Sequence, residues 1–224
     1  MTFTYYFWYT ISKILAWSFF GFRVIHRERL IEEGPVILAS NHQSYFDPPL
    51  VGICSRRAVY YLARKTLLNI PLLGPLLPSI NVIPVDRDGN DMSALKKIIR
   101  LVRAGNGVVL FPEGTRSPDG ALQRGKSGVG LIIAKTRAPV QPVRIFGAHE
   151  AFPKGSDKIS LNPISVVVGE PIHFTDEELD AKNHGDDDRA LYQYLSDRVM
   201  NAIAQLELPD SLPSNRPKTM LPYS

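Results

Sequence analysis

The chain has 224 residues, enough for one domain with a short accessory segment, and its 44% hydrophobic and 21% charged residues are ordinary for a globular protein. Its single cysteine, Cys54, excludes an internal disulfide framework and a cysteine-based zinc site. Residues 1–150 hold 19 Lys and Arg against 10 Asp and Glu, so this basic part predicts an anionic partner: nucleic acid, membrane headgroups or a phosphorylated substrate.

The chain opens with an apolar and aromatic segment. Residues 3–22 contain one charge, Lys13, and several arginines follow directly. A signal peptide is a poor match because there is no basic start and no small-residue cleavage site, and a spanning helix would place the lysine at its middle. Trp8 and Trp17 favour the level of the lipid headgroups. We therefore expect residues 1–22 to form a membrane-anchoring helix at the interface, with a true span or a buried core helix as the alternatives.

After this segment, strand-like apolar runs alternate with segments of helical spacing. We expect strands within residues 22–31, 35–40, 58–64, 81–87, 107–117, 139–147 and 158–174, and helices within residues 48–57, 91–105, 126–138 and 176–207. Three prolines and a glycine break residues 67–80 into an irregular apolar segment that could line a groove. The alternation predicts an α/β fold with a mixed, largely parallel sheet flanked by helices. Residues 23–208 would form this domain, and residues 209–224 a loose Pro-rich tail.

Two ionisable side chains follow the apolar run at residues 35–40, in the stretch SNHQSYFDPP. Five residues of helix turn through about 500°, so His42 and Asp47 would not share a helix face. Pro48 favours a helix that begins after Asp47, which leaves a compact turn in which the carboxylate folds back onto the imidazole. Such a pair suits general-base chemistry. The alternative is structural: Asp47 caps the helix and His42 is a core residue.

A second polar stretch, FPEGTRS at residues 111–117, also follows an apolar strand. A Gly-Thr turn presents backbone N–H groups, and the planar guanidinium of Arg116 suits a phosphate. Glu113 could hold that guanidinium or a substrate hydroxyl. The alternative is an ordinary polar turn with an ion pair between Glu113 and Arg116.

Cationic residues bracket the irregular apolar segment. Arg64 and Lys65 precede it, and Arg87 follows it. A lipid with an anionic head would suit this arrangement, and surface charges without a ligand are the alternative.

Together these stretches resemble the sequence blocks of the glycerolipid acyltransferases. NHQSYFD resembles the family's Asn-His-x4-Asp block, and FPEGTRS matches its second signature block. Further blocks follow in the family's order at residues 70–74, 80–87, 126–136 and 138–143, so the resemblance covers roughly residues 24–172. Among the family's members, the chain looks most like those that acylate lysophosphatidate to phosphatidate, and the resemblance implies their glycerol-phosphate acyltransferase-like α/β fold.

The resemblance implies a role for each matching residue. His42 would be the general base on the acceptor hydroxyl, Asp47 its orienting partner, and Arg116 a contact to the acceptor phosphate. The other residues implied in acceptor binding are Arg64, Lys65, Arg87, Glu113, Gly114 and Thr115. Arg64 stands where the family often has lysine, and that block's glutamate is lost, so the identity of the acceptor stays open.

The resemblance further implies direct transfer without a covalent acyl-enzyme. The expected partners are the membrane bilayer, a lysophospholipid acceptor and a donor that is acyl-CoA or acyl-carrier protein, without nucleic acid, metal or further cofactor. The expected location is the cytoplasmic membrane, with a monotopic or peripheral chain whose active site faces the cytoplasm. The alternatives are the same chemistry on glycerol 3-phosphate or a lyso amino-acid lipid, and a non-catalytic membrane-binding protein of the same fold.

Overall fold

The structure is a computed structural model that describes residues 3–71, 73–85 and 92–210. Its helices and strands, in chain order, are α1 (Phe3–Phe20), β1 (Arg23–Ile25), β2 (Val36–Ser40), α2 (Asp47–Cys54), β3 (Val59–Arg64), α3 (Leu73–Leu76), β4 (Val82–Val85), α4 (Met92–Arg103), β5 (Gly107–Leu110), α5 (Ser127–Thr136), β6 (Val140–Phe146), α6 (Ala148–Ala151), β7 (Ser165–Val168) and α7 (Asp188–Ala204). The tail from residue 211 and the loop 86–91, which contains Arg87, lie outside the described residues.

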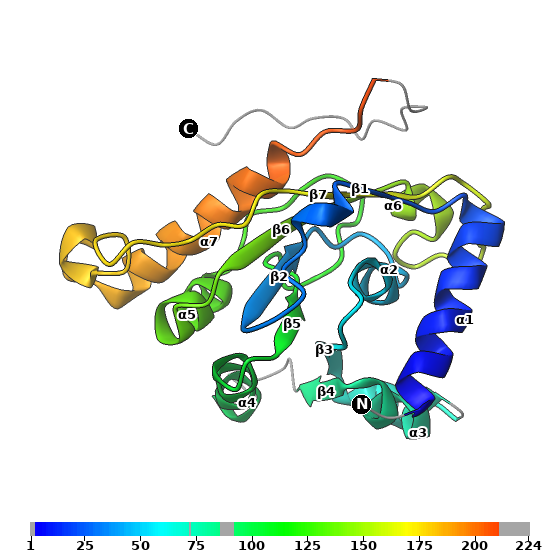
Figure 1. Cartoon of the computed structure of the whole chain (residues 1–224), viewed down its shortest axis with the longest axis horizontal. Coiled ribbons are helices and arrows are strands. Elements are labelled where there is room, and N and C mark those ends of the chain that lie inside the picture. The colour runs from blue at the N-terminus through cyan, green and yellow to red at the C-terminus, as the bar shows by residue number, and fades with distance from the viewer. Residues whose placement is uncertain (1–2, 72, 86–91, 211–224) are drawn as a thin grey trace.

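The described strands form one seven-stranded sheet in the order β1-β7-β6-β2-β5-β3-β4 (Figure 1). β6 and β7 are antiparallel, and the other neighbouring pairs are parallel. All five residues of the central strand β2 are buried, as is typical of a parallel strand covered on both faces. The predicted mixed, largely parallel sheet flanked by helices is confirmed.

Alternate residues of β2 face two different hydrophobic clusters. Val36 and Leu38 pack in a cluster with residues of α1 and α2, whereas Ile37 and Ala39 pack in a cluster with residues of α4, α5 and α7. The period of two is what a strand requires when helices cover both faces of its sheet. The result is a three-layer sandwich, with α1 and α2 on one side of the sheet and α4, α5 and α7 on the other (Figure 1).

The N-terminal helix α1 packs against α2 and leaves much of its apolar surface uncovered. Tyr5 and Ala16 are buried. Its exposed large side chains are Phe3, Tyr6, Phe7, Trp8, Ile14, Leu15, Trp17 and Phe19. Within the described part of the chain, no helix has both the length and the hydropathy needed to cross a bilayer. Membrane contact by α1 stays a prediction.

Three predicted elements are shorter in the structure. The strand predicted within residues 22–31 ends at Ile25, because His26 adopts the left-handed conformation with φ of 58°. The final helix begins at Asp188 rather than near residue 176, because the Asp187 side chain accepts a hydrogen bond from the Arg189 N–H and caps it. Of residues 158–174, only β7 forms a strand.

Candidate active site

The two motif loops meet because their strands are parallel neighbours. β2 leads into His42 and β5 leads into Glu113, and the two strands pair in register from Val36 with Gly107 to Ala39 with Leu110. The carboxyl ends of parallel strands lie at the same edge of a sheet, so the loops that follow them are adjacent there. Both motif loops therefore lie at the carboxyl edge of the sheet, where the sequence placed them.

The turn after β2 brings His42 and Asp47 together. The distance from His42 Nδ1 to Asp47 Oδ2 is 2.8 Å, and the Asp47 side chain is fully buried. The backbone N–H groups of Gln43 and Ser44 donate to the same Oδ2, at 2.6 and 2.7 Å. Because Oδ2 already accepts two N–H bonds, Nδ1 is the donor to it, and in a neutral imidazole the other ring nitrogen, Nε2, then carries the lone pair. α2 begins at Asp47, one residue earlier than predicted.

The loop after β5 holds the backbone of His42 from both sides. The N–H of His42 donates to Glu113 Oε1 at 3.0 Å, and its carbonyl accepts from the Ser117 N–H at 2.7 Å. The imidazole stacks on the Phe111 ring, with centroids 4.1 Å apart and planes at 21°. The 111–117 loop therefore fixes the position of the His42 backbone and the orientation of its ring.

Glu113 lies behind the site rather than on its surface. Its side chain is 2% exposed, and its Oε2 is buried without a hydrogen-bond partner among the described residues. Burial raises the pKa of the Glu113 carboxyl to about 8; the His42 N–H opposes this shift, and the negative charge of Asp47 adds to it. The ion pair between Glu113 and Arg116 considered from the sequence is not formed in the described part of the chain.

Arg116 lies flat over an aromatic ring at the mouth of the site. Its guanidinium carbon is 3.4 Å from the centroid of Tyr45, in a cation–π contact. The Arg116 Nη1 is buried and has no hydrogen-bond partner among the described residues. Because a guanidinium presents five donors, this side chain has donors left for an anion.

Two further lysines flank the 111–117 loop. Lys154 Nζ donates to the Arg116 carbonyl at 3.3 Å. The Lys126 side chain lies over Gly114, whose φ is +69°, so closely that a Cβ on that glycine would be 2.9 Å from Lys126 Cδ. Thr115 is half-buried between Gly114 and Arg116. Arg116, Lys126 and Lys154 thus form a cationic mouth around this turn.

Arg64 and Lys65 lie at the same edge of the sheet but farther from the histidine. Both are exposed where β3 ends, one strand beyond β5 in the sheet order. Their chain neighbours Ala63 and Leu67 line an apolar pocket. Any part they play in binding stays a prediction, as does that of Arg87.

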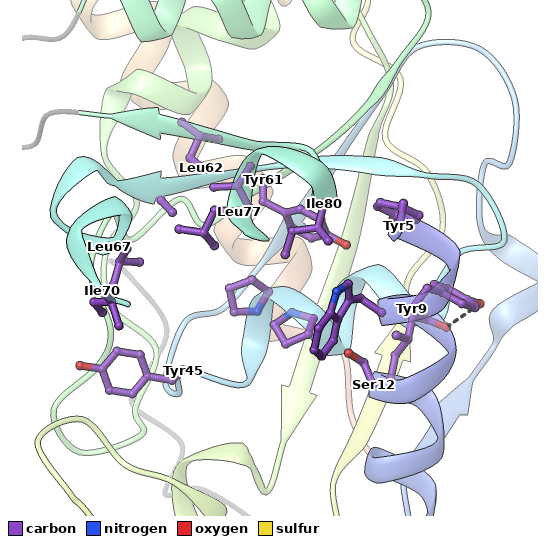
Figure 2. Close-up of a pocket in the computed structure, with 16 residues that line it drawn as sticks. Tyr5, Tyr9, Ser12, Tyr45, Tyr61, Leu62, Leu67, Ile70, Leu77 and Ile80 are labelled. Carbon is purple, nitrogen blue, oxygen red and sulfur yellow. Dashed lines mark hydrogen bonds between the residues drawn. The ribbon is translucent and has the colours of Figure 1, made fainter. Parts of the chain in front are cut away.

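The apolar pocket has a volume of about 510 Å³, and Tyr45, from the turn between His42 and Asp47, is part of its lining (Figure 2). Pro48 and Pro49 come from the start of α2. The predicted groove segment contributes Leu67, Ile70, Leu77 and Ile80, and α1 closes the pocket with Tyr5, Trp8, Tyr9 and Ser12. The sequence predicted the segment 67–80 as a lining but gave no sign that α1 forms the opposite wall.

Cys54 lies in the hydrophobic core and not in the His42 site. It is fully buried in α2, and burial raises the pKa of its thiol to about 12, so it stays protonated.

The sequence did not reveal three residues that build the site. Asn41 exchanges two hydrogen bonds with the backbone of Ile145 on β6, from Ile145 N–H at 2.8 Å and to Ile145 carbonyl at 3.0 Å. Tyr45 supports Arg116, and Lys154 comes from a distant loop. Only Asn41 carried a signal, as part of the first motif; the other two depend on tertiary contacts.

The chain is similar in sequence to proteins named as acyltransferases. A family model described as Acyltransferase matches residues 21–146. The chain is 34% identical over 149 residues to a protein of Brassica napus named 1-acyl-sn-glycerol-3-phosphate acyltransferase BAT2, chloroplastic, covering 65% of this chain and 43% of that protein. It is 29% identical over 158 residues to the Bacillus subtilis 1-acyl-sn-glycerol-3-phosphate acyltransferase, covering 70% of this chain and 76% of that protein.

A solved structure has the same fold. The crystal structure of the 1-acyl-sn-glycerophosphate acyltransferase PlsC from Thermotoga maritima matches with a TM-score of 0.68 at 25% identity, covering 90% of this chain and 80% of that one. The chain spans less than half the length of the plant relatives from Brassica napus and Arabidopsis thaliana that it matches, at 43% and 46%.

Proposed function

The chain belongs to the acyltransferase family, and from this premise we propose that it moves a fatty acyl chain from a thioester donor to the sn-2 hydroxyl of lysophosphatidate, giving phosphatidate. The observation that carries the proposal is the His42–Asp47 pair, whose backbone is tied to the 111–117 loop by two hydrogen bonds. The names of the relatives support lysophosphatidate as the acceptor.

In the proposed mechanism, His42 is the general base. Its Nε2 takes the proton of the acceptor hydroxyl as the oxygen attacks the thioester carbonyl carbon, and Asp47 stabilises the imidazolium that forms. The tetrahedral intermediate then expels the thiolate, which takes the proton from Nε2. The products are the acylated lipid and the free thiol of CoA or of acyl-carrier protein, with no covalent acyl-enzyme.

The oxyanion of the intermediate needs N–H donors. The N–H groups of His42, Gln43 and Ser44 are already bound to Glu113 or Asp47. This occupancy favours the turn at Thr115 and Arg116 over the turn at residues 40–42 as the source of the donors.

We assign the charged and apolar parts of the lipid substrates to different walls of the site. Arg116 binds the acceptor phosphate, with help from Gly114, Thr115 and Arg87, while Arg64 and Lys65 attract the anionic headgroup. The pocket of about 510 Å³ receives the acyl chain of the donor, since its lining is apolar and includes Tyr45 of the turn that follows His42. Glu113 supports this site through the His42 backbone.

We further propose that α1 holds the domain at a membrane surface from one side, without spanning it. Its exposed aromatic and aliphatic side chains would lie at headgroup depth. The exposed surface of α1 supports this assignment, and the arginines that follow it would face anionic lipid.

The proposal is tested with purified protein, labelled acyl-CoA or acyl-carrier protein, and a panel of acceptors. Lysophosphatidate, glycerol 3-phosphate and a lyso amino-acid lipid are offered separately, and the products are separated by headgroup. Labelled phosphatidate formed only with lysophosphatidate supports the proposal. Label that appears only in the product of another acceptor would reassign the substrate, and no transfer with any donor would refute the activity.

A further inference from the structure

A second apolar groove lies on the other side of α2 from the first. It has a volume of about 420 Å³ and runs between α1, α2 and the loop before β7. Three residues, Ser12, Pro49 and Ile53, line both the groove and the larger pocket, so the two share a wall formed by α1 and α2.

Adjacent residues of the turn between His42 and Asp47 line the two cavities. Tyr45 lines the larger pocket and Phe46 lines the second groove, and Asp47 follows directly. From this point the larger pocket extends toward β3 and β4, while the groove extends toward Ile159, Leu161 and Ile164. Two apolar channels beside one turn could hold the two acyl chains of a reaction that joins an acyl donor to an acylated acceptor there.

A row of side chains in contact, whose ring pairs are tilted, connects the groove to the cationic mouth. Arg116 covers Tyr45 at 3.4 Å, and the Tyr45 and Phe152 rings have centroids 5.5 Å apart. Phe152 then contacts Phe46 at 5.2 Å, and Phe46 contacts Phe20 of α1 at 5.3 Å. Phe46 and Phe20 line the groove itself. These contacts link the Arg116 guanidinium to the lining of the apolar groove.

The loop that floors the groove carries the exposed charges Lys154, Asp157 and Lys158 beside its apolar side chains. Ile159 and Leu161 are 55% and 67% exposed and line the groove, and the exposed lysines Lys154 and Lys158 belong to the same loop. Lys154 reaches the Arg116 carbonyl. A phosphate at Arg116 and Lys154 therefore leaves an attached chain beside the apolar side chains of this loop.

We infer that the second groove binds the acyl chain that the acceptor already carries, while the larger pocket holds the chain being transferred. This inference rests on the proposed function. In a lysophospholipid, the phosphate, the reacting hydroxyl and the existing chain are attached to three adjacent carbons. Arg116, His42 and the groove wall at Phe46 meet at one turn, since Tyr45 contacts Arg116 and Phe46 precedes Asp47, the partner of His42.

The test compares acceptors that differ only in chain length. Kinetics are measured with oleoyl- and hexanoyl-lysophosphatidate in detergent micelles of fixed composition, for the wild type, Leu161→Gln and Ile159→Gln. Each buried methylene contributes up to roughly fourfold in binding, so we expect either variant to raise the KM for the oleoyl acceptor about threefold to tenfold. The KM for the hexanoyl acceptor should change less than about twofold, since its chain ends before these residues.

Two control variants separate the groove from the pocket and from the general surface. Ile70→Gln, in the larger pocket only, should change the preference for donor chain length and leave the acceptor dependence as in the wild type. Met92→Gln, at a 51% exposed position on α4, should change neither the preference for donor chain length nor the dependence on acceptor chain length. The contrary result is that Leu161→Gln raises the KM equally for both acceptors and weakens sedimentation with vesicles. That result would mean that the groove only contacts the membrane, and it would overturn the inference.

Binding without a donor separates this inference from the proposed function. Equilibrium binding of the two acceptors to the wild type and to Leu161→Gln is measured with no thioester present. Tighter binding of the oleoyl acceptor that is lost in Leu161→Gln supports the groove even if no transfer is detected. Unchanged binding in the variant refutes the groove even if the wild type forms phosphatidate.

Discussion

His42 is held by its backbone as firmly as by its side chain. The Asp47 carboxylate fixes the ring, while Glu113 and Ser117 fix the main chain on either side of it. The ring orientation is thus set before any substrate binds, which is the condition under which a general base is most effective.

Replacing His42 should remove the base and leave the fold intact. We expect His42→Ala to lower kcat by at least about 10²-fold, the usual contribution of a general base. Steady-state rates with lysophosphatidate measure this effect, and circular dichroism checks the fold. His184→Ala, in a short turn before α7, is the matched control and should keep wild-type rates. Wild-type turnover in His42→Ala would refute the assignment.

Arg116 should act on acceptor binding more than on chemistry. Hydrogen bonds to a charged group contribute about 1.5–3 kcal/mol, so Arg116→Ala should raise the KM for lysophosphatidate by roughly tenfold or more, with a smaller change in kcat. Arg103→Ala, an exposed arginine at the end of α4, should leave both constants as in the wild type. An unchanged KM in Arg116→Ala would argue against its role on the phosphate.

Glu113 should make stability depend on pH in an unusual direction. Its pKa is raised from 4.5 to about 8, so the folded chain keeps a proton that the unfolded chain releases between these values. The free energy of unfolding should therefore fall as pH rises through this window, with the full contribution present only below the unfolded pKa.

Glu113→Gln should remove this dependence, since a neutral amide keeps the oxygen that accepts from His42 N–H. Urea unfolding of both proteins at several pH values between about 4.5 and 8 measures the difference. Identical slopes with pH in the two proteins would contradict the raised pKa.

At the scale of elements, α5 and α7 approach each other closely enough to require a glycine. A Cβ on Gly130 of α5 would be 1.8 Å from the Tyr192 carbonyl oxygen of α7. Gly128, on the same helix, would place a Cβ in open space. These two positions therefore test helix propensity and helix packing separately.

Gly130→Ala should destabilise the domain by about 1–3 kcal/mol, the usual cost of overpacking, because backbone atoms must move apart. Gly128→Ala should be neutral or stabilise by up to about 1 kcal/mol, since alanine is the better helix former. Urea denaturation of both variants gives the free energies of unfolding. Equal stability of the two variants would mean that α5 and α7 are farther apart than described.

The elements were largely predictable from the sequence, and their contacts were not. Apolar alternation and proline or glycine signals predicted the strands and helices around β2 to β6, and position in the chain placed both motifs after strands. The truncation of the first strand at His26 depends on a backbone conformation, and the α1 wall of the pocket depends on tertiary packing, so neither has a local signal. Burial likewise has no local signal. The sequence offered both Glu113 and Arg116 as binding residues, but Glu113 is buried and Arg116 is partly exposed.

At the scale of the whole molecule, the uncovered side of α1 is the feature that a soluble globular domain would ordinarily bury. Trp17 is 73% exposed and lines neither of the two apolar cavities, so it probes the outer surface of the helix alone. An exposed patch of this kind is typical of an interaction surface.

Trp17→Glu should weaken binding to anionic vesicles while leaving the fold intact. A carboxylate is unfavourable at headgroup depth beside anionic lipid, whereas an indole is favoured there. Co-sedimentation with vesicles at low and moderate salt measures the loss, and Met92→Glu on α4 serves as the control. Equal sedimentation of Trp17→Glu and the wild type would place the membrane contact elsewhere.

The pairing of β2 with β5 has a consequence for how the two strands must align. A shift of two residues between them would keep the same side chains facing each layer, so hydrophobic burial alone penalises it weakly. The same shift would move His42 about 7 Å along the sheet relative to Glu113 and Ser117, and both backbone hydrogen bonds would be lost. The apolar side chains of β2 and β5 therefore do not distinguish the observed register from one shifted by two residues, whereas the hydrogen bonds at the polar ends of these strands do. If only chains in the observed register are active, turnover per molecule measures the fraction of chains that folded in it.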